Sequence, residues 1–139
     1  MYRTALLALT LSACAVPDAT EQADLVIAVY ERDYADLSDA DAECVRDACV
    51  RYARLGHDSV KRCGGGNIGC TVTGPRNARV WIGNGLSDQD EAWTLRHEYT
   101  HVLLWCVTGD SHESHDAPEF GYAAEVNAPG SLSAEADSL

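Results

Sequence analysis

Residues 87–109 read Ser-Asp-Gln-Asp-Glu-Ala-Trp-Thr-Leu-Arg-His-Glu-Tyr-Thr-His-Val-Leu-Leu-Trp-Cys-Val-Thr-Gly, and the expected fold is built around them. Ser87 with Asp90 three residues later forms a capping-box-like start, and Gly109 is a natural helix stop. One apolar stripe recurs at helical spacing, nearly opposite the two histidines, and consists of Ala92, Leu95, Tyr99, Val102, Leu103 and Cys106. The stretch predicts a helix at residues 87–108, with one face in a core and the other available for a functional site.

The histidines of this helix belong to the pattern His97-Glu98-Tyr99-Thr100-His101. Residues four apart lie on the same face of a helix, so the two imidazoles can bind one zinc ion while the intervening glutamate lies beside it. Bound zinc brings the pKa of a water molecule toward neutrality, and a nearby carboxylate can take its proton as the water attacks a carbonyl. The pattern predicts His97 and His101 as zinc ligands and Glu98 as general base. An amphipathic helix with two incidental surface histidines is the alternative.

A catalytic zinc ion usually has a third protein ligand, which must come from outside this helix. The following segment, residues 109–116, reads Gly-Asp-Ser-His-Glu-Ser-His-Asp, so several of its side chains can bind a metal. His115 leaves six residues after Gly109 for the chain to reverse, whereas His112 leaves only three. We therefore expect His115 to be the third ligand of a single Zn²⁺ ion, with His112 or an acidic residue such as Asp116 as alternatives.

Beyond the motif, the order of elements resembles the core of the zincin metallopeptidases, in particular small bacterial lipoproteins of that kind. A strand at residues 79–83, a turn, the HExxH helix and a His-bearing turn carry the resemblance, which covers residues 78–122. In comparable small bacterial proteins a Gly-Asp-x-x-x-x-His segment follows such a helix, and His115 is the histidine at that position here. The resemblance implies an α+β fold: a minimal zincin-like domain with a short mixed sheet, a backing helix and an HExxH active-site helix.

The resemblance also implies an activity, the hydrolysis of peptide bonds by a zinc-activated water with Glu98 as general base. In zincins the strand before the helix often pairs with the substrate backbone, and residues 80–82 would be that strand here. Two departures leave the subfamily open, because the third histidine of metzincins would fall at Val107 and no methionine follows Met1 to form a Met-turn. Tyr122 is a candidate donor to the developing oxyanion.

The preceding part of the chain predicts the elements that pack around this helix. Residues 25–30, Leu-Val-Ile-Ala-Val-Tyr, are a short β-favouring run that predicts a buried strand. Residues 38–55 predict the backing helix, with Ser38 as its cap and Gly56 as its stop. Residues 61–77 are rich in glycine and polar residues, which predicts a loop with one hairpin.

The N-terminus predicts an exported lipoprotein. Arg3 precedes a short apolar core, and residues 11–14, Leu-Ser-Ala-Cys, resemble the bacterial lipobox, in which the cysteine sulfur is acylated. We expect residues 1–13 to be a lipoprotein signal peptide and Cys14 the lipidation site, which would anchor the protein to the bacterial cell envelope on its periplasmic or outer surface. An ordinary secretory signal cleaved a few residues later is the alternative, and either signal leads out of the cytoplasm.

The remaining boundaries follow from length and composition. A chain of 139 residues has room for one hydrophobic core, which we expect in a metallopeptidase domain at residues 25–125. An acidic linker at residues 14–24 would precede it. Residues 126–139 contain no Lys or Arg and are rich in small residues, so they predict an acidic disordered tail.

Export also predicts disulfide bonds, because disulfides persist in oxidising compartments. Cys63 and Cys70 are the expected pair, since the Gly-Gly-Gly-Asn run at residues 64–67 can turn the chain back within reach of a disulfide. The other three cysteines after Cys14 would form one more bridge and leave one free thiol, in a pairing that the sequence leaves open. A cysteine-rich zinc site is the alternative.

The charge of the chain argues against one class of partner. Ten Lys and Arg stand against 22 Asp and Glu, and the net charge of −12 would repel a phosphate backbone. We therefore expect no nucleic-acid partner, a polypeptide substrate, and contact with a membrane through the lipid anchor only. Two other functions stay open: a zinc hydrolase acting on a non-protein amide such as cell-wall material, and a non-catalytic surface lipoprotein that holds zinc or a protein partner.

Overall fold

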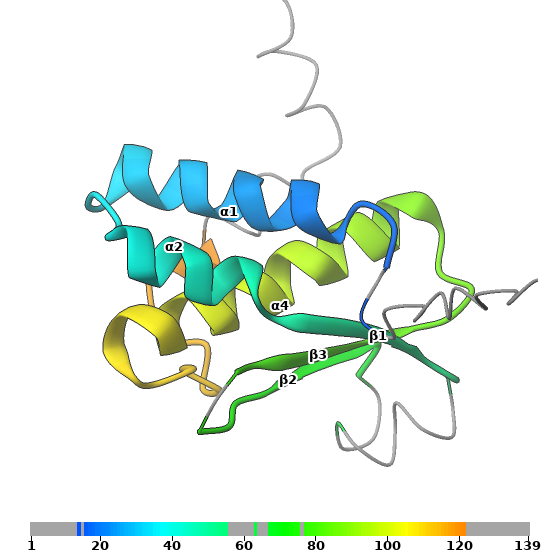
Figure 1. The fold of residues 1–139 in the computed structure, drawn as a ribbon. Coiled ribbons are helices and arrows are strands. Elements are labelled where there is room, and N and C mark those ends of the chain that lie inside the picture. The colour runs from blue at the N-terminus through cyan, green and yellow to red at the C-terminus, as the bar shows by residue number, and fades with distance from the viewer. Residues whose placement is uncertain (1–13, 15, 56–62, 64–66, 76, 122–139) are drawn as a thin grey trace, which may run out of the picture.

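The computed structural model describes residue 14 and residues 16–55, 63, 67–75 and 77–121. Its elements, in chain order, are α1 (Ala19–Asp33), α2 (Asp39–Arg46), β1 (Cys49–Ala53), β2 (Gly69–Val72), β3 (Arg79–Gly83) and α4 (Asp88–Thr108). The fold is α+β, as predicted. The long helix α4 lies between the small sheet and α1, and it packs against α2 as well (Figure 1). The predicted signal peptide, the predicted tail and Tyr122 lie outside the described residues.

The sheet is short and mixed, which confirms the predicted type. Its strand order is β1-β3-β2; β1 runs parallel to β3, and β2 runs antiparallel to it. Val50 of β1 and Thr71 of β2 therefore both stand opposite Val80 of β3. Because β3 is paired on both sides, the expectation that residues 80–82 pair with a substrate is wrong. Among the described residues, β1 and β2 are the two edge strands. The residues of β2 were expected in a loop with one hairpin, and they pair with β3 instead.

The helix α4 begins and ends where the sequence predicts. The Ser87 hydroxyl accepts a hydrogen bond from the backbone N–H of Asp90 at 3.1 Å and donates one to the Asp90 carboxylate at 2.7 Å. Gly109 ends the helix with a φ of 81°, a left-handed conformation that glycine adopts without strain. Leu95, Tyr99, Val102 and Leu103 of the predicted stripe are buried in the core. Cys44 of α2 and Cys106 of α4 form a disulfide that ties the two helices together.

The predicted strand at residues 25–30 is wrong, because these residues lie inside α1. Residues 19–24, expected to belong to a linker, form the first part of the same helix. Four-residue spacing explains the result: Ala19, Ala23 and Ile27 are all buried in the core cluster that includes residues of α4. The contacts with α4 thus outweigh the β propensity of a run that, by itself, favours a strand.

The predicted backing helix at residues 38–55 is correct only in its first half. The Ser38 hydroxyl accepts a hydrogen bond from the Asp41 N–H, as a capping box should, but α2 ends at Arg46. Cys49–Ala53 then form β1, which pairs in parallel with β3. Val50 in this strand is almost fully buried against the core. Strand pairing with a segment about thirty residues away overrides the local helical pattern, which extends past the true end of the helix.

All six cysteines are paired in the structure. Cys63–Cys70 is the predicted bridge and is confirmed, whereas the expected free thiol is wrong. The third bridge joins Cys14 to Cys49, so the Cys14 sulfur is not available for acylation in this structure, and the predicted lipid anchor is without support. Three disulfides indicate an oxidising compartment outside the cytoplasm. None of the described helices is both long and apolar enough to cross a membrane.

Candidate metal centre

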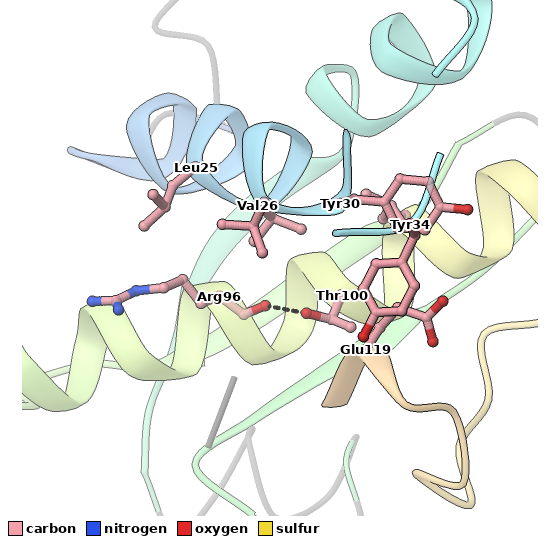
Figure 2. A pocket seen from close by; sticks show the side chains of 9 residues that line it. Leu25, Val26, Tyr30, Tyr34, Arg96, Thr100 and Glu119 are labelled. Atoms are coloured by element: carbon pink, nitrogen blue, oxygen red, sulfur yellow. Dashed lines mark hydrogen bonds between the residues drawn. The ribbon is translucent and has the colours of Figure 1, made fainter. Parts of the chain in front are cut away.

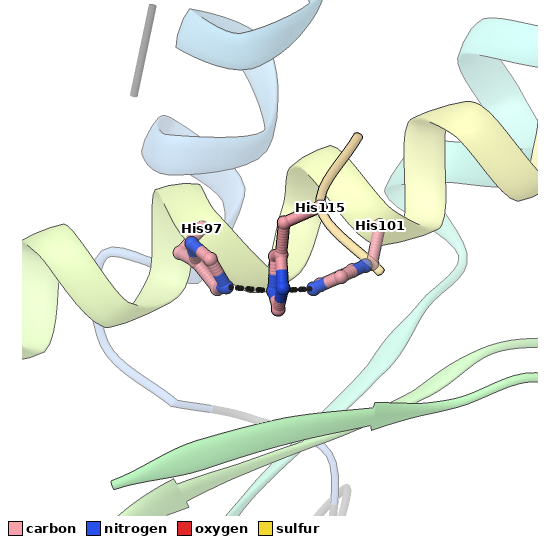
Figure 3. A group of neighbouring side chains, drawn as sticks. All are labelled: His97, His101 and His115. Atoms are coloured by element: carbon pink, nitrogen blue, oxygen red, sulfur yellow. Dashed lines mark hydrogen bonds between the residues drawn. The ribbon is translucent and has the colours of Figure 1, made fainter. Parts of the chain in front are cut away.

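Three imidazole rings meet below α4. His97 and His101 project from successive turns of the helix, and the His115 side chain reaches in between them from the following loop (Figure 3). The Nε2 atom of His115 lies 3.0 Å from that of His97 and 3.1 Å from that of His101. In a tetrahedral zinc site, with Zn–N bonds of about 2.0–2.1 Å, ligand nitrogens lie roughly 3.3 Å apart. The three rings could therefore hold one metal ion.

The loop after α4 brings His115 to the centre and leaves His112 outside it. The backbone N–H of His112 donates a hydrogen bond to Asp110 Oδ1 at 2.8 Å, and the N–H of His115 donates one to the His112 carbonyl at 2.9 Å. Both histidines have positive φ, 52° and 56°, which makes the turn tight enough to bring the chain back. The ring of His112 contacts Asp116 at 3.1 Å instead of the other imidazoles. The carboxylate of Asp116 is thus next to His112, not next to the centre.

The protonation of His101 is set by a backbone contact. Its Nδ1 lies 2.6 Å from the carbonyl oxygen of Ser111. A carbonyl can only accept, so Nδ1 carries the proton and donates it to this bond. In the neutral ring, the lone pair then lies on Nε2, the atom that faces His115. A backbone carbonyl that orients an imidazole in this way is a common partner of metal-binding histidines.

Burial keeps the two helical histidines neutral. Burial, together with the neighbouring His101 and His115, lowers the pKa of His97 to about 4. Burial also lowers the pKa of His101, against the opposing effect of its bond to the Ser111 carbonyl. Metal ions bind the neutral form of imidazole. Both rings are therefore ready as ligands at neutral pH.

Glu98 lies beside the histidines but points toward the sheet. The residue is only 4% exposed, and its Oε2 accepts a hydrogen bond from the Thr71 hydroxyl of β2 at 2.8 Å. Burial raises the pKa of this carboxyl to about 7, although the bond from Thr71 acts in the opposite direction. A carboxyl with such a pKa can both take and give up a proton near neutrality.

Two aromatic rings, which the sequence reasoning missed, enclose the imidazoles. Phe120 is buried, and its centroid lies 5.5 Å, 4.5 Å and 4.9 Å from those of His97, His101 and His115. Trp93, one helical turn before His97, stacks on that ring at 5.4 Å. Phe120 is the only phenylalanine in the chain, and that is the one signal in the sequence that could have drawn attention to it.

The centre opens into a cavity of about 570 Å³ between α4 and β2. His97, Glu98, His101 and His115 line one side, and all four residues of β2 line the other, together with the Cys63–Cys70 bridge. A second pocket lies between α1 and α4, where Tyr30 and Tyr34 stack near Thr100 (Figure 2). That pocket encloses only about 30 Å³, room for roughly one or two water molecules.

No protein family model, curated protein or solved structure matches the chain. What can be said of the function therefore follows from the geometry and chemistry of this centre.

Proposed function

We propose that the protein is an exported zinc metallopeptidase of the zincin type. The observation that supports this most directly is the convergence of three imidazole nitrogens and one buried carboxyl on a single cavity. The ion would be bound by His97, His101 and His115, and Glu98 would transfer the protons of the reaction. The three disulfides agree with action outside the cytoplasm.

Zinc fits this set of donors better than the hard cations do. Imidazole suits zinc and other late first-row metals, whereas magnesium and calcium prefer oxygen ligands. A catalytic zinc ion has three protein ligands and keeps a further position open for water or substrate. The cavity next to the three histidines provides space for that position.

The proposed reaction is hydrolysis of a peptide bond. A bound zinc ion would polarise the scissile carbonyl and make a water molecule more acidic. Glu98 would accept the proton of the attacking water and pass it to the leaving amine, as a general base and then a general acid. Its raised pKa, about 7, suits both steps. Phe120 and Trp93 would exclude bulk water from the imidazoles.

The proposed substrate is an extended polypeptide segment. β2 lines the cavity with all four of its residues and has no strand beyond it among the described residues. An unpaired strand edge can bind an extended chain through backbone hydrogen bonds. β2 thus takes the role that residues 80–82 were expected to have, since β3 is already paired on both sides.

The test is metal-dependent hydrolysis of fluorescein-labelled casein. Purified protein loaded with zinc should cleave casein, lose the activity in a chelator, and regain it when zinc is restored. Peptidoglycan offered in parallel should not be cleaved. Zinc binding without hydrolysis of casein would contradict the peptidase proposal and favour a zinc-holding protein, whereas cleavage of peptidoglycan alone would assign the centre to a non-protein amide.

A further inference from the structure

One side chain of β2 contacts the candidate base directly. Thr71 stands on the face of β2 that is turned to α4, and its Oγ1 lies 2.8 Å from Glu98 Oε2 and 3.1 Å from the Glu98 carbonyl oxygen. A hydroxyl has a single proton, so it donates to one of these oxygens at a time. The carboxyl oxygen is the nearer of the two.

This contact is the carboxyl group's one side-chain hydrogen bond among the described residues. Glu98 is buried, so the carboxyl has little solvent to satisfy it. Its other oxygen, Oε1, accepts no hydrogen bond from the part of the chain that the structure describes. The Thr71 bond therefore determines which oxygen is held and which is free to exchange a proton.

The space for the carboxyl comes from a glycine two residues earlier on the same face of β2. A Cβ added at Gly69 would lie 3.2 Å from Glu98 Oε1 and 2.4 Å from Cγ2 of Thr94. The second distance is shorter than any real carbon contact, so a side chain here would force Thr94 to move. β2 thus gives the carboxyl both room, at Gly69, and a donor, at Thr71.

We propose that Thr71 is a positioning residue for Glu98: its hydroxyl holds Oε2 so that Oε1 faces the reacting water. The proposal rests on the proposed role of Glu98 as general base. Thr71 itself touches neither the metal ligands nor the scissile bond in this scheme, and it acts through the carboxyl alone. A carboxyl that must rotate into place before each proton transfer would react more slowly, because orientation is part of the barrier.

Kinetics of the zinc-loaded protein on labelled casein test this role. Thr71→Val removes the hydroxyl with little change of shape and should lower kcat about 10–100-fold, while KM and zinc affinity stay within about twofold. Thr71→Ser restores the hydroxyl and should recover most of kcat. Thr73→Val, the same change just beyond β2, is the matched control and should behave as the wild type. An unchanged kcat in Thr71→Val, or no recovery in Thr71→Ser, would overturn the proposal.

A second measurement needs neither metal nor substrate. A double-mutant cycle of Thr71→Val and Glu98→Met on the unfolding of the metal-free protein measures what the Thr71 hydroxyl gains from the carboxyl, because with methionine at position 98 it can donate only to the backbone carbonyl. Thr71→Val should raise the unfolding constant about tenfold more when Glu98 is present than when it is methionine. If the wild type cleaves casein but the cycle shows no coupling between Thr71 and Glu98, only the positioning role is overturned. A wild type that cleaves nothing overturns the proposed function, and the positioning role with it.

Discussion

The candidate metal centre joins a helix and a loop that hold their histidines by different means. His97 and His101 are placed by the regular turns of α4, with a capped start and a glycine stop. His115 is placed by a turn in which two non-glycine residues have positive φ, at a cost of order 1–3 kcal/mol each. The helix is therefore organised before a metal binds, whereas the loop has to be held against strain. The two halves should therefore respond differently to mutation.

The largest effect should come from the helical half, at the residue that carries the proton. Glu98→Gln should lower kcat on casein by about 10²–10⁴-fold, because an amide cannot take a proton from water. Zinc content should stay at that of the wild type, since the carboxyl is not a ligand. Kinetics and metal analysis of one preparation check both parts. Near-normal hydrolysis by this variant would contradict the mechanism.

The next effect compares the ligands of the two halves. His101→Ala and His115→Ala should each lower zinc affinity by more than about 100-fold, beyond the 10–100-fold typical of residues that only support a ligand. His112→Ala is the matched control in the loop and should lose little, because its ring contacts Asp116 instead. Competition with a zinc-sensitive dye gives the affinities. If His112→Ala loses more zinc affinity than His115→Ala, His112 is the third ligand instead of His115.

The buried carboxyl of the helical half also gives a pH dependence to the metal-free protein. The pKa of Glu98 is raised from 4.5 to about 7, so its contribution to stability is fully present below the unfolded value and is lost as pH rises through the folded one. Relative to Glu98→Gln, the wild type should lose about 3 kcal/mol of unfolding free energy between those limits. Urea unfolding of both proteins across this range measures the difference. If the difference in unfolding free energy between the two proteins stays constant with pH, the pKa of Glu98 is not raised.

The smallest effect should come from the support of the loop. Asp110→Ala removes the acceptor of the His112 N–H, so the strained turn should populate its bent form less and zinc affinity should fall about tenfold. Asp110→Asn keeps an oxygen at the same place and should restore most of the affinity. If both variants bind zinc as the wild type does, the loop is held by other contacts.

The sequence predicts the features of α4 that depend on local chemistry. The Ser87 cap, the Gly109 stop and the four-residue histidine spacing all lie within one helix, and they appear where expected. The Cys63–Cys70 bridge is also local, because it closes a short glycine-rich loop.

Features that depend on distant partners were misread or missed. Residues 25–30 have the composition of a strand, but they form a helix because they pack against α4. Cys49–Ala53 continue a helical pattern, but they form a strand because they pair with β3. Thr71 and Glu98 are 27 positions apart in the chain, and the sequence near either residue does not predict their contact. The residues before Cys14 predict a lipidation site, whereas in the fold Cys14 forms a disulfide with Cys49.

Metal analysis can show whether His97, His101 and His115 form one metal site. Wild type and a His97→Ala/His101→Ala/His115→Ala variant would be incubated with zinc, freed of excess ion and analysed by mass spectrometry. We expect about one zinc ion per chain in the wild type and none in the variant, which keeps all three disulfides. Equal zinc in the two proteins, or no zinc in the wild type, would mean that these three histidines do not form a zinc site.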